Sequence, residues 1–179
     1  MKKDIFTSIR GRVERTQKPD VHKTFKIGSQ SVEALAVEDS EFVDGKIEEI
    51  TLDYFAQADD GGVYYLGEDV DEYTDGKVSG HSGGWLLGRD TKTPGLLMPA
   101  HPVIGDKFKS EDVPKITTEE DEVVSVSGSV TVPAGTYENC VKIVEKPSDG
   151  KTEYKYYAPG VGCVKEVESD GEFQLQTHN

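Results

Sequence analysis

The sequence predicts an all-β domain: an antiparallel meander that forms a curled sheet, a half-open barrel or a sandwich. Asp-Gly pairs occur at 44–45, 60–61, 75–76, 149–150 and 170–171, each beside strand-forming residues. Such pairs favour type I′ turns, which need positive φ at both central residues and join antiparallel strands. Alternation of apolar and polar residues in the last third of the chain is the second observation. The third is the absence of a convincing helical period, so we expect about eight to ten strands.

The first predicted hairpin covers residues 31–57 and turns at the first Asp-Gly pair. A two-residue turn would pair Val37 with Leu52 and place both side chains on one face of the sheet. The same register puts Phe42 and Ile47 together on the other face, near the tip. That mismatch indicates a bulge, a longer loop, or a tip that is covered on both sides.

The clearest strand covers residues 124–132, and a hairpin partner follows it. Gly128 interrupts its apolar row and indicates a bulge or a close backbone approach. The polar side of this strand is expected to meet solvent, as in antiparallel sheets that are covered on one side only. The residues predicted to be buried here are Val124, Val126, Val130, Val132, Val141 and Ile143.

The predicted organisation is an N-terminal arm over residues 1–20 and a single β domain over 21–179. Within that domain, about residues 79–114 form a Gly/Pro-rich insert that is too rich in breakers for an extended strand or helix. The insert holds the only tryptophan, Trp85, which we expect to pack into the sheet and hold the segment in place. Residues 115–122 are acidic and expected to be exposed.

A net charge of −14 limits the possible partners. Nucleic-acid affinity comes mainly from Lys and Arg on phosphates, so nucleic acid is excluded as a partner, and anionic membranes are disfavoured for the same reason. No apolar run reaches the ~18 residues of a membrane-spanning helix, so no transmembrane segment is expected. Lys2 and Lys3 give the start of the chain the basic character of a signal peptide, but no apolar stretch follows them.

No catalytic or metal-binding motif is present in the sequence. The four histidines lack the spacing of a zinc site, and Ser82 beside His81 is not in a Gly-x-Ser-x-Gly phrase. We therefore assign no catalytic residues, no metal ligands and no cofactor. Calcium is the one cofactor kept as an alternative, because residues 57–62 and 67–72 offer several carboxylates near turns. A hydrolase site built from His81 or His101 and nearby carboxylates is the third reading.

Two cysteines, Cys140 and Cys163, are a disulfide candidate. They fall on consecutive predicted strands, and a bend after Pro159 could bring their Cα atoms within the ~7 Å that a disulfide needs. Two reduced, buried thiols are the alternative, and the sequence leaves both open.

Aromatic side chains are the candidates for ligand contact, with Tyr65, Trp85 and Tyr156 as the predicted binding residues. Tyr and Trp have an apolar body and a polar tip, which suits a half-wet groove. Core and cross-strand packing is the alternative role of these aromatics.

Four phrases occur in order between about residues 37 and 167. They are Asp53-Tyr-Phe-Ala-Gln-Ala-Asp-Asp-Gly-Gly-Val-Tyr-Tyr-Leu-Gly-Glu-Asp-Val, Pro94-Gly-Leu-Leu-Met-Pro-Ala-His-Pro, Val132-Pro-Ala-Gly-Thr-Tyr-Glu-Asn-Cys and Tyr156-Tyr-Ala-Pro-Gly-Val-Gly. Together they resemble a family of uncharacterised bacterial secreted or lipoprotein-type β proteins. The third and fourth phrases are also similar, more weakly, to periplasmic lipoprotein carriers built on a half-open antiparallel barrel. The chain departs from the family at Cys163, where an aliphatic residue is expected.

The resemblance implies a secreted or cell-envelope setting, with a cytoplasmic location as the alternative, and it supplies no catalytic residues. Combined with the one-sided alternation, it predicts a non-enzymatic, envelope-associated β domain that binds a small-molecule or protein ligand on one sheet face. The alternative is a calcium- or metal-binding envelope protein.

Overall fold

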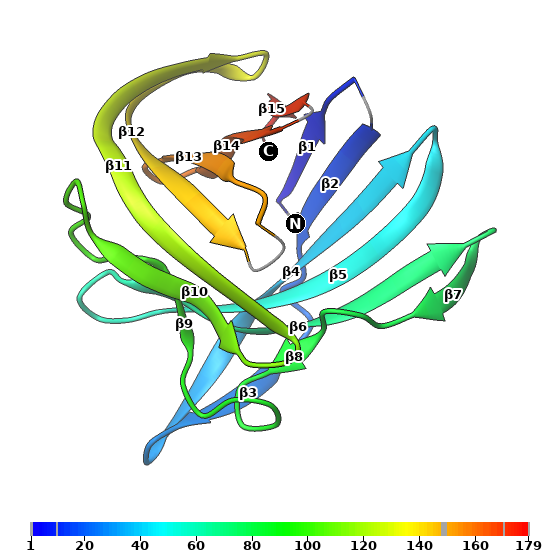
Figure 1. Cartoon of the computed structure of the whole chain (residues 1–179), viewed down its shortest axis with the longest axis vertical. Helices are drawn as coiled ribbons and strands as arrows, with labels where there is room; N and C mark the ends of the chain where they lie inside the picture. The colour runs from blue at the N-terminus through cyan, green and yellow to red at the C-terminus, as the bar shows by residue number, and fades with distance from the viewer. Residues whose placement is uncertain (1, 10, 148–149, 170, 179) are drawn as a thin grey trace.

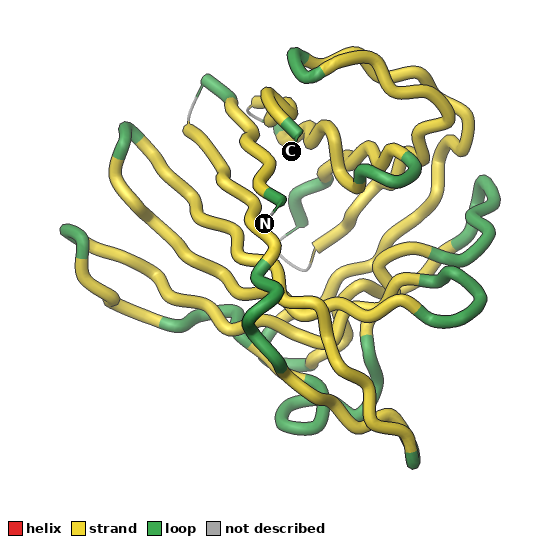
Figure 2. Tube along the Cα trace, turned by 180° about the vertical axis from the view of Figure 1, so that it is seen from behind, coloured by secondary structure: helices red, strands yellow, loops and turns green. Residues whose placement is uncertain are grey.

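The computed structural model describes residues 2–9, 11–147, 150–169 and 171–178, and the described residues form strands and turns without a helix (Figures 1 and 2). Asp149 and Asp170, the first residues of two predicted turns, lie outside the described residues. The strands are β1 (Lys3–Thr7), β2 (Gly11–Gln17), β3 (Lys23–Ile27), β4 (Gln30–Val43), β5 (Lys46–Gln57), β6 (Val63–Thr74), β7 (Lys77–Gly80), β8 (Trp85–Leu86), β9 (Gly95–Met98), β10 (Lys107–Val113), β11 (Thr117–Val132), β12 (Gly135–Pro147), β13 (Glu153–Ala158), β14 (Gly162–Glu168) and β15 (Gly171–Thr177). The all-β, antiparallel prediction is confirmed, but the prediction of eight to ten strands was too low.

One antiparallel sheet contains all of these strands, in the order β10-β11-β12-β13-β14-β15-β1-β2-β4-β5-β6-β7. Strand β3 pairs with β4, and the short β8 and β9 pair with β6. Because β1 lies between β15 and β2, the two ends of the chain meet in the middle of the sheet (Figure 1). The expected N-terminal arm over 1–20 is therefore wrong for residues 3–7 and 11–17, which form β1 and β2, two integral strands of the sheet.

The sheet curls without closing, and its two ends approach each other where β9 and β10 meet (Figure 1). A Cβ atom on Gly95 of β9 would lie 1.7 Å from the carbonyl oxygen of Ser110 on β10, so only glycine permits this approach. The predicted Gly/Pro-rich insert over 79–114 is irregular up to about residue 106, apart from the short β8 and β9. The predicted C-terminal end of the insert, residue 114, is wrong, because residues 107–113 form strand β10.

Two of the predicted turns have the expected geometry. Asp44 and Gly45 have φ of 51° and 77°, and Asp75 and Gly76 have φ of 52° and 73°. Both residues of each pair therefore have the positive φ of a type I′ turn. The pair at 60–61 differs, because its aspartate carboxylate accepts a hydrogen bond of 2.9 Å from the backbone N–H two residues on, as in an Asx turn.

A bulge changes the register of the first hairpin. Phe42 pairs with Ile47 as the two-residue turn requires, but the register shifts between Glu41 and Phe42. Beyond that bulge Val37 pairs with Asp53 instead of Leu52. The slip of one residue moves every later side chain of one strand to the opposite face. The pairing predicted for Val37 was therefore wrong, while the predicted bulge is confirmed.

Three apolar clusters pack the sheet. The first lies where the end of the β11–β12 hairpin packs on β13, β14, β15 and β1, the second between β3 and strands β4 to β6, and the third beside β10. Their buried members are Phe6, Val130, Val132, Cys140, Ala158, Val164 and Leu175 in the first, Phe25, Ala34, Ala36, Tyr54, Leu66 and Leu87 in the second, and Tyr65, Trp85 and Val113 in the third.

The long β11–β12 hairpin contains repeated bulges. Register shifts fall between Val123 and Ser125, and on both sides of Gly128, so the bulge predicted at the glycine is confirmed. Each shift exchanges the two faces of the strand, and Val123 is fully buried as a result. Of the six predicted core residues, Val130, Val132 and Ile143 are buried, while Val124, Val126 and Val141 are half-buried.

Candidate functional site

The inner side of the curled sheet encloses an open cavity of about 970 Å³. Figure 1 looks into the opening between β2, β4, β5 and β6 on one side and β11 to β14 on the other. The lining contains many more carboxylates than cations. The charged lining residues are Lys2, Asp4, Arg15, Asp39, Glu41, Glu49, Asp53, Glu68, Glu111, Glu119, Glu145, Lys155 and Glu166, with His178 beside them.

The alternation of β4 and β5 explains why this interior is polar. Val37, Asp39, Glu41, Glu49, Thr51, Asp53 and Phe55 line the cavity at every second position. Ala36 and Tyr54, the neighbours in between, are buried in the second cluster on the other side of the sheet, under β3. These strands therefore have their apolar face outward, beneath a covering strand, and their acidic face inward.

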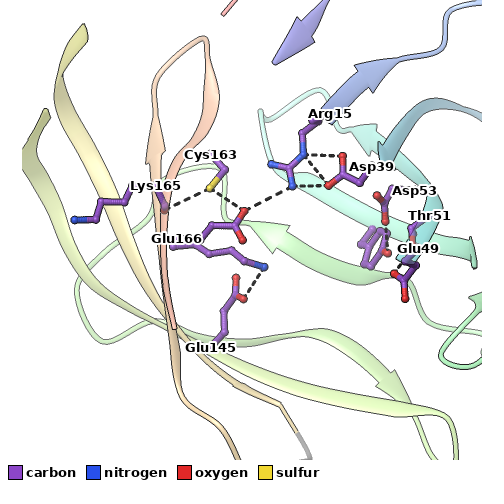
Figure 3. A network of polar contacts seen from close by, with 11 residues as sticks. Arg15, Asp39, Glu49, Thr51, Asp53, Glu145, Cys163, Lys165 and Glu166 are labelled. Atoms are coloured by element: carbon purple, nitrogen blue, oxygen red, sulfur yellow. Dashed lines mark hydrogen bonds and ion pairs between the residues drawn. The ribbon is translucent and has the colours of Figure 1, made fainter. Parts of the chain in front are cut away.

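A bidentate ion pair stands at the centre of the cavity. Arg15 Nε lies 3.0 Å from both carboxylate oxygens of Asp39, and Arg15 Nη2 lies 2.6 Å from Asp39 Oδ2 (Figure 3). The same Nη2 is 3.6 Å from Glu166 Oε1. Burial raises the pKa of Glu166, but Lys155 and Arg15 outweigh that effect, so the pKa is lower than usual. Glu166 is therefore an ionised, charge-balanced group.

Lys155 continues this network to β12. Its Nζ lies 2.8 Å from Oε2 of Glu145, which Figure 3 labels. Burial alone lowers the pKa of Lys155, but Glu145 and Glu166 outweigh it and raise the pKa above its usual range. Lys155 is therefore a fixed positive charge inside the cavity.

Cys140 and Cys163 are both free and buried. Val141 pairs with Tyr157 of β13, and Tyr157 pairs with Cys163, so β13 lies between the strands that carry the two cysteines. Two strand spacings amount to about 10 Å, beyond the reach of a disulfide. The disulfide candidate is wrong in this structure, because the chain adds a complete strand between the cysteines. Burial raises the pKa of Cys163, which makes it an inert thiol.

An acid–aromatic wall, formed by Asp53, Phe55, Tyr65, Glu68 and Glu111, lines the cavity at β5, β6 and β10. The Phe55 and Tyr65 rings stack with centroids 5.0 Å apart. The Tyr65 hydroxyl donates a hydrogen bond of 2.5 Å to Asp53 Oδ1. The wall thus combines two stacked aromatic rings, of which Tyr65 is buried and Phe55 is half-buried, with carboxylates.

The carboxylates of this wall are held close together in a water-poor site. Burial, followed by the charges of Glu111 and Asp53, raises the pKa of Glu68 to about 8. Burial and the charge of Asp39 raise the pKa of Asp53 to about 7. Both groups therefore change ionisation state near neutral pH.

The three predicted ligand-binding residues have different positions. Tyr65 lines the cavity. Trp85 is fully buried behind Tyr65. The centroids of the two rings lie 5.3 Å apart, with an angle of 79° between the ring planes. Trp85 Nε1 donates a hydrogen bond of 3.1 Å to Glu111 Oε1. The packing predicted for Trp85 is confirmed, and Trp85 supports the wall from behind. Tyr156 lies between the cavity-lining Lys155 and Tyr157, so it points to the opposite side of β13 and is not part of the cavity wall.

A second acidic group, the carboxylate triad of Glu119, Asp121 and Glu145, lies on β11 and β12. One potential ligand atom from each side chain lies within 4.8 Å of the other two. Burial, then the charges of Glu119 and Glu145, raises the pKa of Asp121 to about 8. The expectation that residues 115–122 are exposed holds for Lys115, Ile116 and Glu120 and is wrong for Asp121, which is buried on β11.

The histidines do not support the hydrolase reading. His81 Nδ1 is 2.9 Å from Asp71 Oδ1, but neither residue lines the cavity, and His101 is exposed. A different histidine–carboxylate pair, His178 and Asp4, lines the cavity, with His178 Nδ1 2.9 Å from Asp4 Oδ1. No hydrogen bond within the described residues joins His178 to a serine or cysteine, so a nucleophile is not in place.

The two acidic segments proposed for calcium have structural roles, and the second of them, residues 67–72, lies within β6. Asp60 closes its own turn, and Asp69 Oδ2 accepts hydrogen bonds from Lys23 Nζ at 2.8 Å and from the Tyr54 hydroxyl at 2.9 Å. Among the described residues, neither segment contributes to a group of three potential metal ligands. The group of three is the carboxylate triad, which these segments did not indicate.

Comparison with protein families, curated proteins and solved structures found no match to the chain. The family resemblance and the envelope setting that it implies therefore stay predictions. The described part of the chain contains no helix with the length and apolar character needed to cross a membrane.

Proposed function

We propose that the protein is a non-enzymatic binding domain whose inner cavity takes up a small organic cation, such as a linear polyamine. The observation that carries this proposal is the acid–aromatic wall, which places Asp53, Glu68 and Glu111 around Tyr65 on the side of an open cavity. Two cations that line the cavity, Arg15 and Lys155, are already paired with other carboxylates. The wall therefore has a surplus of negative charge that an incoming cation would neutralise.

Two physical effects favour an organic cation over a neutral ligand. An ammonium or guanidinium group near Glu68 favours the ionised carboxylate, whose pKa is raised to about 8 by burial and by the charges of Glu111 and Asp53. The half-buried ring of Phe55 adds cation–π attraction, of about 0.5–2 kcal/mol for a well-placed cation. The cavity volume of about 970 Å³ suits a ligand of drug-like size.

The secreted or envelope setting is part of this proposal and rests on the family resemblance. A protein at the cell surface or in the periplasm would meet polyamines and cationic peptides as free solutes. Immunoblotting of cytoplasmic and envelope fractions of the source organism tests this setting. Recovery of the protein in the cytoplasmic fraction alone would contradict it.

Calorimetric titration with spermidine at pH 8 and low salt tests the binding proposal. We expect one spermidine per chain, with affinity that falls as salt is added, because the attraction is electrostatic. Glu68→Gln removes a charge from the wall and is expected to weaken binding about tenfold, a change of about 1.4 kcal/mol. Glu48→Gln makes the same substitution at an exposed position of β5 and serves as the matched control.

The titration separates a built site from general attraction to an acidic surface. If Glu68→Gln and Glu48→Gln weaken the binding of spermidine equally, the wall is not the site. The same follows if many spermidine molecules bind to each chain without saturation. 1,4-Butanediol tests the need for positive charge and is expected to show no heat of binding.

A further inference from the structure

The carboxylate triad has a different character from the acid–aromatic wall, and it points to an inorganic ligand. We propose that Glu119, Asp121 and Glu145 form a binding site for a divalent cation that prefers oxygen ligands, with Ca²⁺ as the best fit. This inference goes beyond the proposed function, because it concerns other residues and another class of ligand.

The strand register brings the three carboxylates together. Asp121 on β11 is the direct antiparallel partner of Glu145 on β12. Glu119 stands two residues before Asp121 on the same strand, so its side chain lies on the same face. Their potential ligand atoms lie within 4.8 Å of one another, and oxygens on opposite sides of one Ca²⁺ are about 4.6–5.2 Å apart.

An independent observation is that two oxygens of this group have no hydrogen bond. Asp121 and Glu145 are 1% and 2% exposed. Within the described part of the chain, Asp121 Oδ1 and Glu145 Oε2 are buried without a hydrogen-bond partner. A buried acceptor without a partner costs about 1–3 kcal/mol. A bound cation would satisfy both oxygens at once.

The surroundings leave the charge of the triad incompletely balanced. Lys155 Nζ lies 2.8 Å from Glu145 Oε2 and forms an ion pair with it, so Asp121 Oδ1 is the triad oxygen that has neither a hydrogen bond nor an ion pair among the described residues. Ser110 Oγ donates a hydrogen bond of 2.6 Å to Glu119 Oε1, which leaves the other oxygen of that carboxylate available. One lysine faces three carboxylates, so a divalent cation improves the local charge balance.

The donor set selects the kind of cation. The group contains carboxylates and neither a histidine nor a cysteine. Oxygen donors of this kind suit Ca²⁺, Mg²⁺ and Mn²⁺, whereas Zn²⁺ and Cu²⁺ sites use nitrogen and sulfur ligands. Ca²⁺ tolerates irregular geometry better than Mg²⁺, which needs a near-ideal octahedron. Three carboxylates on two paired strands supply only part of the six ligands of an octahedron.

The test is thermal unfolding of EDTA-treated protein in CaCl₂, with calorimetric titration of Ca²⁺ in parallel. Binding to the folded state raises the Tm by about 5 °C or more at a concentration about a hundred times the Kd. Asp121→Asn is expected to reduce the Tm shift at least threefold, and Glu119→Gln provides a second variant in case one of them folds poorly.

Glu122→Gln is the matched control, since Glu122 is the next residue on β11 and pairs with Lys107 and Lys146 away from the triad. An unchanged Ca²⁺ shift in Glu122→Gln and a lost shift in Asp121→Asn would support the site. Equal shifts in all variants, or no shift in the wild type, would overturn it. Glu68→Gln is expected to keep the full Ca²⁺ effect, so failure of the spermidine test and failure of this test are distinguishable.

Discussion

Replacing Asp121 with asparagine is expected to stabilise the cation-free protein at alkaline pH. In the folded state the pKa of Asp121 is raised to about 8 from an ordinary value of 3.8, by burial and by the neighbouring carboxylates. The residue is 1% exposed, so solvent screening is small. Asparagine has nearly the same shape and no charge to bury, and therefore avoids the cost of ionisation.

The size of the stabilisation follows from the pKa shift of Asp121. A pKa difference of about four units corresponds to about 6 kcal/mol, at 1.36 kcal/mol per unit. This value is an upper bound, because the site can relax when Asp121 ionises. A net gain of about 1–3 kcal/mol at pH 8 is the expected result for removing one buried, unpartnered ionisable oxygen.

The sign of the pH dependence is fixed by the direction of the shift. An acid whose pKa is raised on folding stabilises the folded state most below its ordinary pKa, and that contribution is lost as the pH rises through the folded pKa. The advantage of the asparagine variant should therefore grow between pH 5 and pH 8. Urea unfolding with EDTA present measures it at both values. A variant that is less stable than the wild type by the same amount at both pH values would refute the reasoning.

Three other predictions concern the remaining features. The wild-type protein should lose stability between pH 5 and pH 9 in EDTA, because Asp53 and Glu68 also have raised pKa values, of about 7 and 8; urea midpoints that rise with pH would contradict this. Trp85→Phe should lower the free energy of unfolding by about 1–3 kcal/mol, through lost packing and the lost hydrogen bond to the half-buried carboxylate of Glu111; a neutral effect would show that this indole does not support the wall. Thiol counting on unfolded, unreduced protein should find two free thiols, from Cys140 and Cys163, and a count of zero would contradict the strand order.

The local features of the fold were predictable from the sequence. Asp44-Gly45 and Asp75-Gly76 form the expected turns, because their chemistry is decided by two residues alone. The burial of Trp85 follows from its size among residues that cannot form regular structure by themselves. Tyr65 lines the cavity, and the ligand contact predicted for it stays a prediction.

The predictions that failed concern features that depend on pairing between strands distant in sequence. The bulge beside Phe42 shifts the register of a whole hairpin, and its position depends on both strands together. The N-terminal strands pair with β15 at the other end of the chain, which no local pattern reveals.

The acidic interior was missed because a polar strand face was expected to meet solvent. A signal was present on one strand, since Glu49, Thr51 and Asp53 alternate with Ile50 and Leu52. The same alternation fits either a solvated face or a polar cavity, and the curl of the sheet decides between them. The triad was not predictable from local sequence, because strand register brings Glu145 beside Glu119 and Asp121 from a distant part of the chain.

The most direct test of the central claim is a titration of isotope-labelled protein with spermidine, followed through the backbone amide signals. The account predicts that the signals that move most come from β5 and β6 around Asp53, Tyr65 and Glu68, and that these changes are lost in Glu68→Gln. Signals of β7 and of the outer strand β3 should stay in place. Changes that are spread over the whole acidic surface, or confined to the outer strands, would contradict the assignment of the cavity as a cation-binding site.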